Sequence, residues 1–122
     1  MRKTGLRVAI VLLIFLAAVA LAASQSGVAD KRQVTFYDPV RIGETLLPAG
    51  EYTVLHQMQG TNHIMVFTQM GKKKAAEAKV KCTLVPLDKP AATSELGFKT
   101  NAANERLLTR MVFKGDRAAH HF

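Results

Sequence analysis

The stretch Thr45-Leu46-Leu47-Pro48-Ala49-Gly50-Glu51-Tyr52-Thr53-Val54 decides the fold class. Two apolar residues lead into Pro-Ala-Gly, and alternating polar and apolar residues follow it. Because proline fixes φ and glycine permits a positive φ, Pro48 and Gly50 predict a turn between two strands. Tyr52 is expected to pack its ring beside this turn and to hydrogen-bond its hydroxyl to loop backbone. The stretch therefore predicts the corner of a β-hairpin.

The same alternation of apolar and polar residues recurs along the chain and predicts about seven short strands. They are expected at residues 33–42 (interrupted at Asp38-Pro39), 45–47, 52–56, 63–70, 78–84, 94–100 and 105–114. A polar loop is expected at residues 57–62, and Gly97 is expected to mark a β-bulge. Short strands separated by turns predict an all-β domain, either an antiparallel β-sandwich or a small β-barrel.

Residues 1–22 have the three parts of a secretory signal peptide, which is expected to be helical. A positively charged start precedes an apolar run at residues 8–21, and Ala20-Leu21-Ala22 gives the small-x-small cleavage pattern. The cut is expected after Ala22 or Ala23. An uncleaved anchor is the alternative, but a spanning helix needs about 20 apolar residues. The sequence thus predicts a secreted or periplasmic protein that meets the membrane only through its leader.

The chain of 122 residues has the length of one domain. The predicted parts are the signal peptide at 1–22, a flexible linker at 23–32, the β-domain at 33–115 and a C-terminal tail at 116–122. The leader carries three of the 17 Lys and Arg and none of the nine acidic residues, so its removal lowers the formal charge from +8 to +5. Cys82 is the only cysteine, which excludes an intramolecular disulfide and favours a bacterial exported protein.

The pattern Phe36-x-x-Pro39-Val40-x-Ile42-Gly43-x-x-Leu46-x-Pro48-Ala49-Gly50-x-Tyr52 resembles a group of small secreted bacterial proteins, common in Acidobacteria. These uncharacterised proteins share a signal peptide and a Leu-Pro-Ala-Gly-x-Tyr corner. The resemblance covers the leader and residues 34–56, and it extends to the later strands only in general pattern. It implies an all-β secreted domain and brings no catalytic residue with it.

Two histidines are the candidate metal ligands. His56 and His63 flank the expected loop and can face each other on neighbouring strands, and neutral imidazole is a common ligand of zinc and copper. The methionines close to them in sequence would suit copper, although methionine more often fills a core. These are Met58, Met65 and Met70. His120 and His121 fall in the expected tail, and Cys82 has the parity of a small core residue.

A basic ribbon is expected where a lysine-rich turn meets the outward face of the next strand. Its members are Lys72, Lys73, Lys74, Lys79 and Lys81. Such a ribbon can attract an anionic component of the cell envelope, or it can simply protect a sheet edge from aggregation. Nucleic acid is not expected as a partner, because the chain is exported and lacks aromatic residues between its basic ones.

No catalytic set is recognisable in the sequence. Ser24, Ser26 and Ser94 lie in expected tail or edge positions, and the carboxylates are scattered. The sequence predicts a non-enzymatic exported β-domain, without a cofactor, that acts by binding or by cell-envelope association. Its partner would be an anionic envelope component or a protein. The two alternatives are a small barrel that carries an apolar ligand and a histidine-based metal-binding protein.

Overall fold

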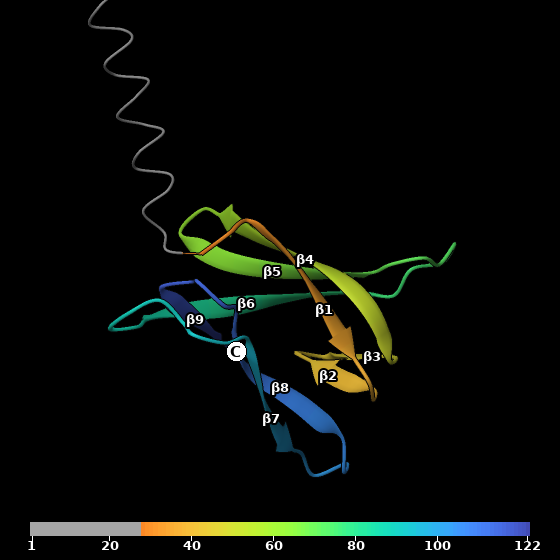
Figure 1. The fold of residues 1–122 in the computed structure, drawn as a ribbon. Coiled ribbons are helices and arrows are strands. Elements are labelled where there is room, and N and C mark those ends of the chain that lie inside the picture. The colour runs from red at the N-terminus through yellow and green to blue at the C-terminus, as the bar shows by residue number, and fades with distance from the viewer. Residues whose placement is uncertain (1–27) are drawn as a thin grey trace, which may run out of the picture.

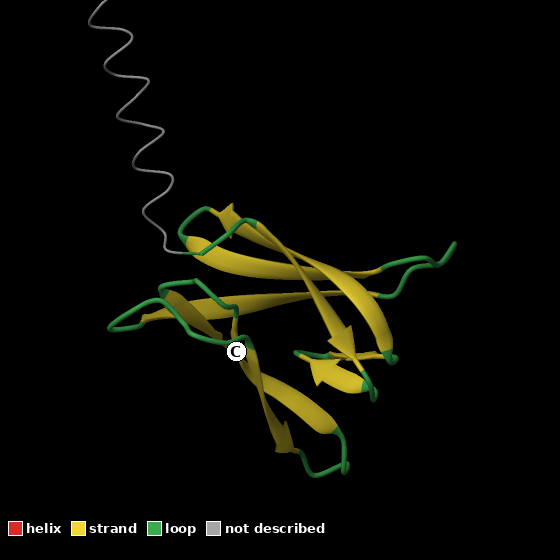
Figure 2. Ribbon diagram, viewed as in Figure 1, coloured by secondary structure: helices red, strands yellow, loops and turns green. Residues whose placement is uncertain are grey.

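The computed structural model describes residues 28–122, and this part of the chain is built from strands and turns alone (Figure 2). The expected signal peptide, its cleavage site at Ala22 or Ala23 and the first part of the linker lie outside the described residues. No helix within residues 28–122 has the length and apolar character needed to cross a membrane. The strands are β1 (Lys31–Phe36), β2 (Val40–Ile42), β3 (Thr45–Leu47), β4 (Gly50–Gln59), β5 (Asn62–Gln69), β6 (Glu77–Pro86), β7 (Glu95–Thr100), β8 (Arg106–Val112) and β9 (Ala118–His121).

The strands form one open, mostly antiparallel sheet. Its order is β1-β4-β5-β6-β9-β8-β2-β3, and β7 pairs with β8 outside this path. The contact of β2 with β8 is parallel, with Arg41 opposite Leu107. The sheet bends strongly, so that β4 and β5 lie above β7 and β8, with β6 and β9 between them (Figure 1). The all-β, antiparallel expectation is confirmed, with nine strands in place of about seven.

The core fills the concave side of this bent sheet. Residues opposite each other in an antiparallel pair share one face, and Val54, Phe67 and Ala78 form such a buried row across β4, β5 and β6. Leu108 and Met111 from β8 belong to the same buried cluster. The two halves of the sheet therefore pack on each other, and each large apolar side chain buried there contributes about 1.5–3 kcal/mol.

The hairpin corner forms as the sequence predicts. Tyr52 is fully buried, and its hydroxyl donates a hydrogen bond of 2.6 Å to the Pro48 carbonyl oxygen. Its ring centroid lies 5.5 Å from that of Phe36 on β1. Gly50 has a φ of +152°, and a Cβ at this position would lie 3.2 Å from the Gln69 amide nitrogen. Glycine is required here because the backbone adopts a conformation that L side chains rarely enter.

Two strands extend further than the sequence indicates. The loop expected at residues 57–62 is instead the end of a long hairpin, in which β4 reaches Gln59 and β5 begins at Asn62. The turn needs only Gly60 and Thr61, because Gly60 adopts a φ of +64°. At the N-terminal end, Lys31 and Arg32 of the expected linker belong to β1. The bulge expected at Gly97 is confirmed by a register shift between Gly97 and Phe98.

The expected C-terminal tail contains a strand that joins the two halves of the sheet. Ala118–His121 form β9, which pairs with Thr83–Pro86 of β6 on one side and with Arg110 and Met111 of β8 on the other. Alanine and histidine have little intrinsic preference for strands. β9 forms because the preceding strand β8 and the distant strand β6 both offer their backbone groups to it, and the pairing with β6 leaves no local signal.

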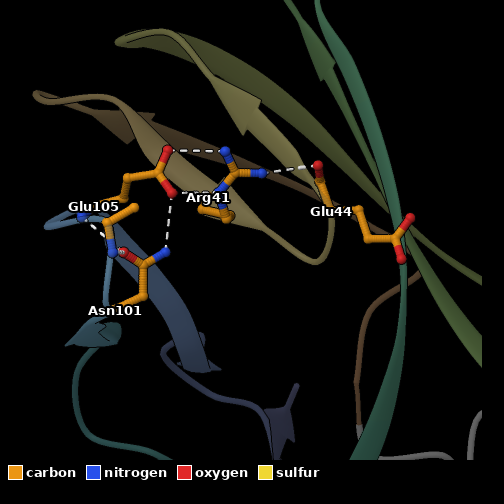
Figure 3. A network of polar contacts seen from close by, with 5 residues as sticks. Arg41, Glu44, Asn101 and Glu105 are labelled. Atoms are coloured by element: carbon orange, nitrogen blue, oxygen red, sulfur yellow. Dashed lines mark hydrogen bonds and ion pairs between the residues drawn. The ribbon is translucent and has the colours of Figure 1, made fainter.

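A polar network fixes the β2–β3 hairpin to the β7–β8 hairpin (Figure 3). The Arg41 guanidinium donates to both carboxylate oxygens of Glu105, at 2.7 and 2.8 Å, and to the Glu44 carbonyl oxygen at 2.8 Å. The Asn101 amide donates to Glu105 at 3.0 Å, and its oxygen accepts from the Glu105 backbone N–H at 2.9 Å. We call Arg41, Asn101 and Glu105 the polar clamp.

Candidate metal centre

The long β4–β5 hairpin brings His56 and His63 together. His56 lies opposite Met65, and His63 lies opposite Met58, so the two histidines are diagonal neighbours on the concave face of the sheet. Their rings are stacked with centroids 5.1 Å apart. The Nδ1 atom of His63 lies 3.1 Å from the Nε2 atom of His56, which is hydrogen-bond distance. The expectation that these histidines face each other is confirmed.

Cys82 and His120 complete the cluster from two further strands. Cys82 on β6 lies opposite His63, and its Sγ atom is 3.6 Å from the Nδ1 atom of His120 on β9. The ring centroids of His120 and His56 are 5.3 Å apart. The ligand atoms of His56, Cys82 and His120 all lie within 4.8 Å of one another. We call these three residues the metal-site trio.

The trio is buried and uncharged. Cys82 is 8% exposed, His120 1% and His56 9%. Burial raises the pKa of the Cys82 thiol to about 11 and, with the neighbouring histidines His56 and His63 and Arg32, lowers the pKa of His120 to about 4. Burial and the neighbouring His63 also lower the pKa of His56, against the opposite effect of Asp30 and Asp116. Neutral imidazole is the form of histidine that binds metal ions.

An ion pair with one buried partner adjoins the trio. Arg32 on β1 donates to a carboxylate oxygen of Asp116, whose side chain is only 5% exposed. The Arg32 guanidinium also lies over the Phe113 ring, 5.5 Å from its centroid, and this ring is 6.2 Å from the His120 ring. Because Asp116 lies two residues before β9, the pair ties the first strand of the sheet to the connection that carries His120 into place.

These distances are close to what one metal ion requires. With bonds of about 2.0–2.1 Å to nitrogen and about 2.3 Å to sulfur, two ligands of a tetrahedral ion lie about 3.3–3.6 Å apart. The separation of Cys82 from His120, 3.6 Å, matches this value. The widest separation in the trio, up to 4.8 Å, must contract by roughly 1 Å. Two imidazoles and one thiol form a ligand set for soft or borderline ions such as zinc and copper.

His63 stands outside the trio and has two ways to support an ion there. It can supply a fourth nitrogen, or it can hold the His56 ring in position through their 3.1 Å hydrogen bond. Histidine ligands commonly use the second ring nitrogen for such an orienting hydrogen bond. His63 is also more exposed than the trio, since it lies next to the exposed end of the β4–β5 hairpin. It therefore forms the solvent side of the centre.

The remaining residues singled out by the sequence lie elsewhere. All five lysines of the ribbon are exposed, three of them on the turn between β5 and β6, at the opposite end of β5 from His63 (Figure 1). Lys79 and Lys81 lie on a part of β6 that precedes its pairing with β9. His121 is exposed beside buried His120, and Met65 is buried at 1% exposure. The lysine ribbon is thus a feature of the surface, whereas the metal-site trio lies in the core.

Sequence reasoning identified His56 and His63 and missed the roles of Cys82 and His120. Cys82 does point into the core as expected, but it meets an imidazole there. The parity of His120 along β9 is visible only once that strand is known. Comparison of the chain with protein-family models, curated proteins and solved structures finds no match.

Proposed function

We propose that this protein is an exported β-domain that acts by binding a transition-metal ion at the trio of His56, Cys82 and His120. It acts through binding and not through catalysis. The observation that carries the proposal is the convergence of two imidazoles and a thiol, from β4, β6 and β9, within 4.8 Å inside the core. An apolar core with no ligand to bind has no need of three such groups at one point, because burying polar groups costs free energy.

Metal binding is favoured over the transport of an apolar ligand by the packing of the core. A carrier requires an apolar interior cavity, yet side chains fill the space between the two halves of the sheet, with Leu47, Tyr52, Phe67 and Met111 at 0% exposure. A surface depression of about 510 Å³ lies beside the β6–β7 connection and has charged residues in its lining. We take the bent sheet as a β-sandwich, since β1 and β3 end its strand path without meeting.

Export supports a metal-binding role for a domain with one thiol. The signal-peptide pattern of residues 1–22 directs the chain out of the cytoplasm, to the periplasm or the medium. In these compartments an accessible thiol is easily oxidised. Cys82 is buried, which protects it, and coordination would protect it further.

The test is a metal analysis of untagged protein purified without chelators, followed by thermal unfolding with added zinc or copper. We expect one equivalent of metal and a raised melting temperature. The matched variants are His120→Gln and His121→Gln, which change the same chemistry at adjacent positions with opposite burial. His120→Gln should abolish the metal-dependent shift, and His121→Gln should retain it.

Two results would contradict the proposal. One is the absence of bound metal together with no thermal shift for the wild-type protein. The other is an equal loss of the shift in both variants, which would place metal at the exposed histidine. Circular dichroism of both variants checks that the sheet is intact. Enzymatic turnover that depends on a surface residue would contradict the non-catalytic part of the proposal.

The basic ribbon supports a second, weaker candidate, association with an anionic component of the envelope. Its five lysines are exposed, and the turn that carries three of them projects beyond the sheet (Figure 1). The attraction would be electrostatic and would fall with added salt. The test compares sedimentation with anionic and neutral vesicles for wild type and for a variant with Lys72, Lys73 and Lys74 replaced by glutamine. Equal sedimentation with both vesicles would remove this candidate.

A further inference from the structure

We propose that the ion bound at the trio is Cu(I), and that Met58 and His63 form the rim through which it enters. This inference rests on the proposed metal-binding function and names the ion and its route. Three features of the described residues carry it: the number and softness of the ligands, the charge of the buried site, and an exposed thioether on the solvent side.

The ligand set favours copper over zinc. Structural zinc is almost always held by four protein ligands, and catalytic zinc keeps water in the fourth position. Here the buried set consists of His56, Cys82 and His120, with no carboxylate among the clustered groups. A thiolate and neutral imidazoles suit Cu(I), which accepts low coordination numbers and prefers soft ligands. His63 remains available on the solvent side without being needed as a buried ligand.

The charge of the site also favours a monovalent ion. A Cys82 thiolate with Cu(I) has no net charge, whereas the same thiolate with Zn(II) leaves one positive charge in the core. An uncompensated buried charge is costly. Two carboxylates act on His56: Asp30 is exposed, so water screens its charge, and Asp116 is already paired with Arg32, so neither offsets a second positive charge in the core. The buried surroundings therefore suit the charge of Cu(I) and do not compensate the additional positive charge of a divalent ion.

The rim provides a soft ligand at the surface. Met58 lies opposite His63 in the β4–β5 pair, so their side chains share the concave face of the sheet. Met58 is 56% exposed, whereas Tyr52, Met65 and Phe67 on this face are buried. A thioether binds Cu(I) and has little affinity for hard ions. Met58 and His63 thus form a series of ligands that leads from solvent to His56 of the trio.

The identity of the ion is tested with metal-free, untagged protein in two competitions. Under anaerobic, reducing conditions the protein competes for Cu(I) with a chromophoric Cu(I) chelator, and in a parallel series it competes for Zn(II) with a zinc indicator. We expect Cu(I) to bind more tightly by about 100-fold or more. Equal or tighter binding of Zn(II) would overturn this inference and leave the metal-binding function standing. Binding of neither ion would overturn both.

The route is tested by the rate at which bound Cu(I) passes to excess chelator. Met58→Leu removes the thioether at the rim, and Met70→Leu is the matched control, because Met70 is also exposed, at 37%, near the far end of the same hairpin. Neither substitution touches the core. We expect a several-fold slower transfer for Met58→Leu and the wild-type rate for Met70→Leu. Equal rates for the two variants would overturn the route.

Discussion

The polar clamp and the metal-site trio are two groups of polar side chains that join distant parts of the same sheet, and they differ in how their hydrogen bonds are satisfied. In the clamp, both carboxylate oxygens of Glu105 accept from Arg41, and Asn101 adds a further donor. In the trio, the contact between Cys82 and His120 is 3.6 Å long and involves a weakly polar sulfur. The clamp is complete without any other group, whereas the trio gains its strongest contacts only when an ion is added.

The polar clamp and the trio also differ in burial. The clamp side chains are 28% and 21% exposed for Arg41 and Glu105, so water competes with each of its bonds. The trio is buried, so its groups have exchanged water for weak partners. The clamp is complete as a structural device, whereas the trio is a buried set of possible metal ligands in which Cys82 and His120 are held by a weak contact. The predictions below test this distinction.

The largest effect is expected at the ion pair of Arg32 with the buried Asp116 carboxylate, beside the trio. Arg32→Met removes the guanidinium and leaves the Asp116 carboxylate in a site where it is 5% exposed. Removing one partner of a buried pair costs about 3 kcal/mol of folding free energy. Urea unfolding of the single variant and of the double variant with Asp116→Asn measures this, and the double variant should recover part of the loss. A loss below about 0.5 kcal/mol would mean that water reaches the carboxylate.

The next effect is the stabilisation of the trio by its ion. At a free Cu(I) concentration about 100 times the dissociation constant, the free energy of unfolding should rise by about 2.7 kcal/mol. Cys82→Ser should abolish this increase, because the thiolate is the main soft ligand. Arg41→Gln should keep it, because the clamp takes no part in the site. An increase that is lost in both variants would contradict the separation of the two networks.

A smaller effect is expected in the acid limb of the curve of unfolding free energy against pH. The hydrogen bond from Arg41, with the bond from Asn101, lowers the pKa of Glu105 from 4.5 to about 2. The unfolded chain therefore takes up this proton at a higher pH than the folded chain does, so stability falls as the pH decreases from about 4.5 to about 2. Glu105→Gln should flatten that part of the curve of unfolding free energy against pH. An unchanged slope would show that Glu105 titrates normally.

The smallest effect is expected at the ion pair of Arg110 and Glu95. Its atoms are 3.4 Å apart, and the side chains are 36% and 62% exposed. Exposed pairs of this kind contribute about 0–1 kcal/mol, and this one lies at the lower end because its contact is long. Glu95→Gln should leave the free energy of unfolding within about 0.5 kcal/mol of wild type in urea unfolding. A loss of folding free energy comparable to that of Arg32→Met would contradict the expectation that burial determines how much an ion pair contributes.

The part of the fold that is local in sequence was predictable. The Pro48–Gly50 turn, the Tyr52 hydrogen bond and the Gly97 bulge all depend on residues within a few positions of one another, and the structure confirms them. The antiparallel, all-β character follows from the same alternation. The number of strands was underestimated, because β9 depends on partners that lie more than 30 residues away along β6.

The candidate site also has a part that is local in sequence, which was predictable, and a part that is not local, which was missed. His56 and His63 belong to one hairpin, so their proximity could be inferred from spacing across a turn. Cys82 and His120 are 38 positions apart, and they meet only because β9 lies between β6 and β8. The polar clamp was also missed, since Arg41 and Glu105 are 64 positions apart. Contacts that depend on the order of the strands in the sheet leave no pattern in a single sequence.

The burial of Tyr52 gives the protein an optical signature. The chain has no tryptophan and two tyrosines, of which Tyr37 is 88% exposed and Tyr52 is fully buried. Its near-ultraviolet absorbance and intrinsic fluorescence therefore come from one phenol in water and one phenol bonded to the Pro48 carbonyl. Unfolding changes the surroundings of Tyr52 far more than those of Tyr37. The corner that begins the hairpin is thus a built-in, label-free reporter of whether the core is intact.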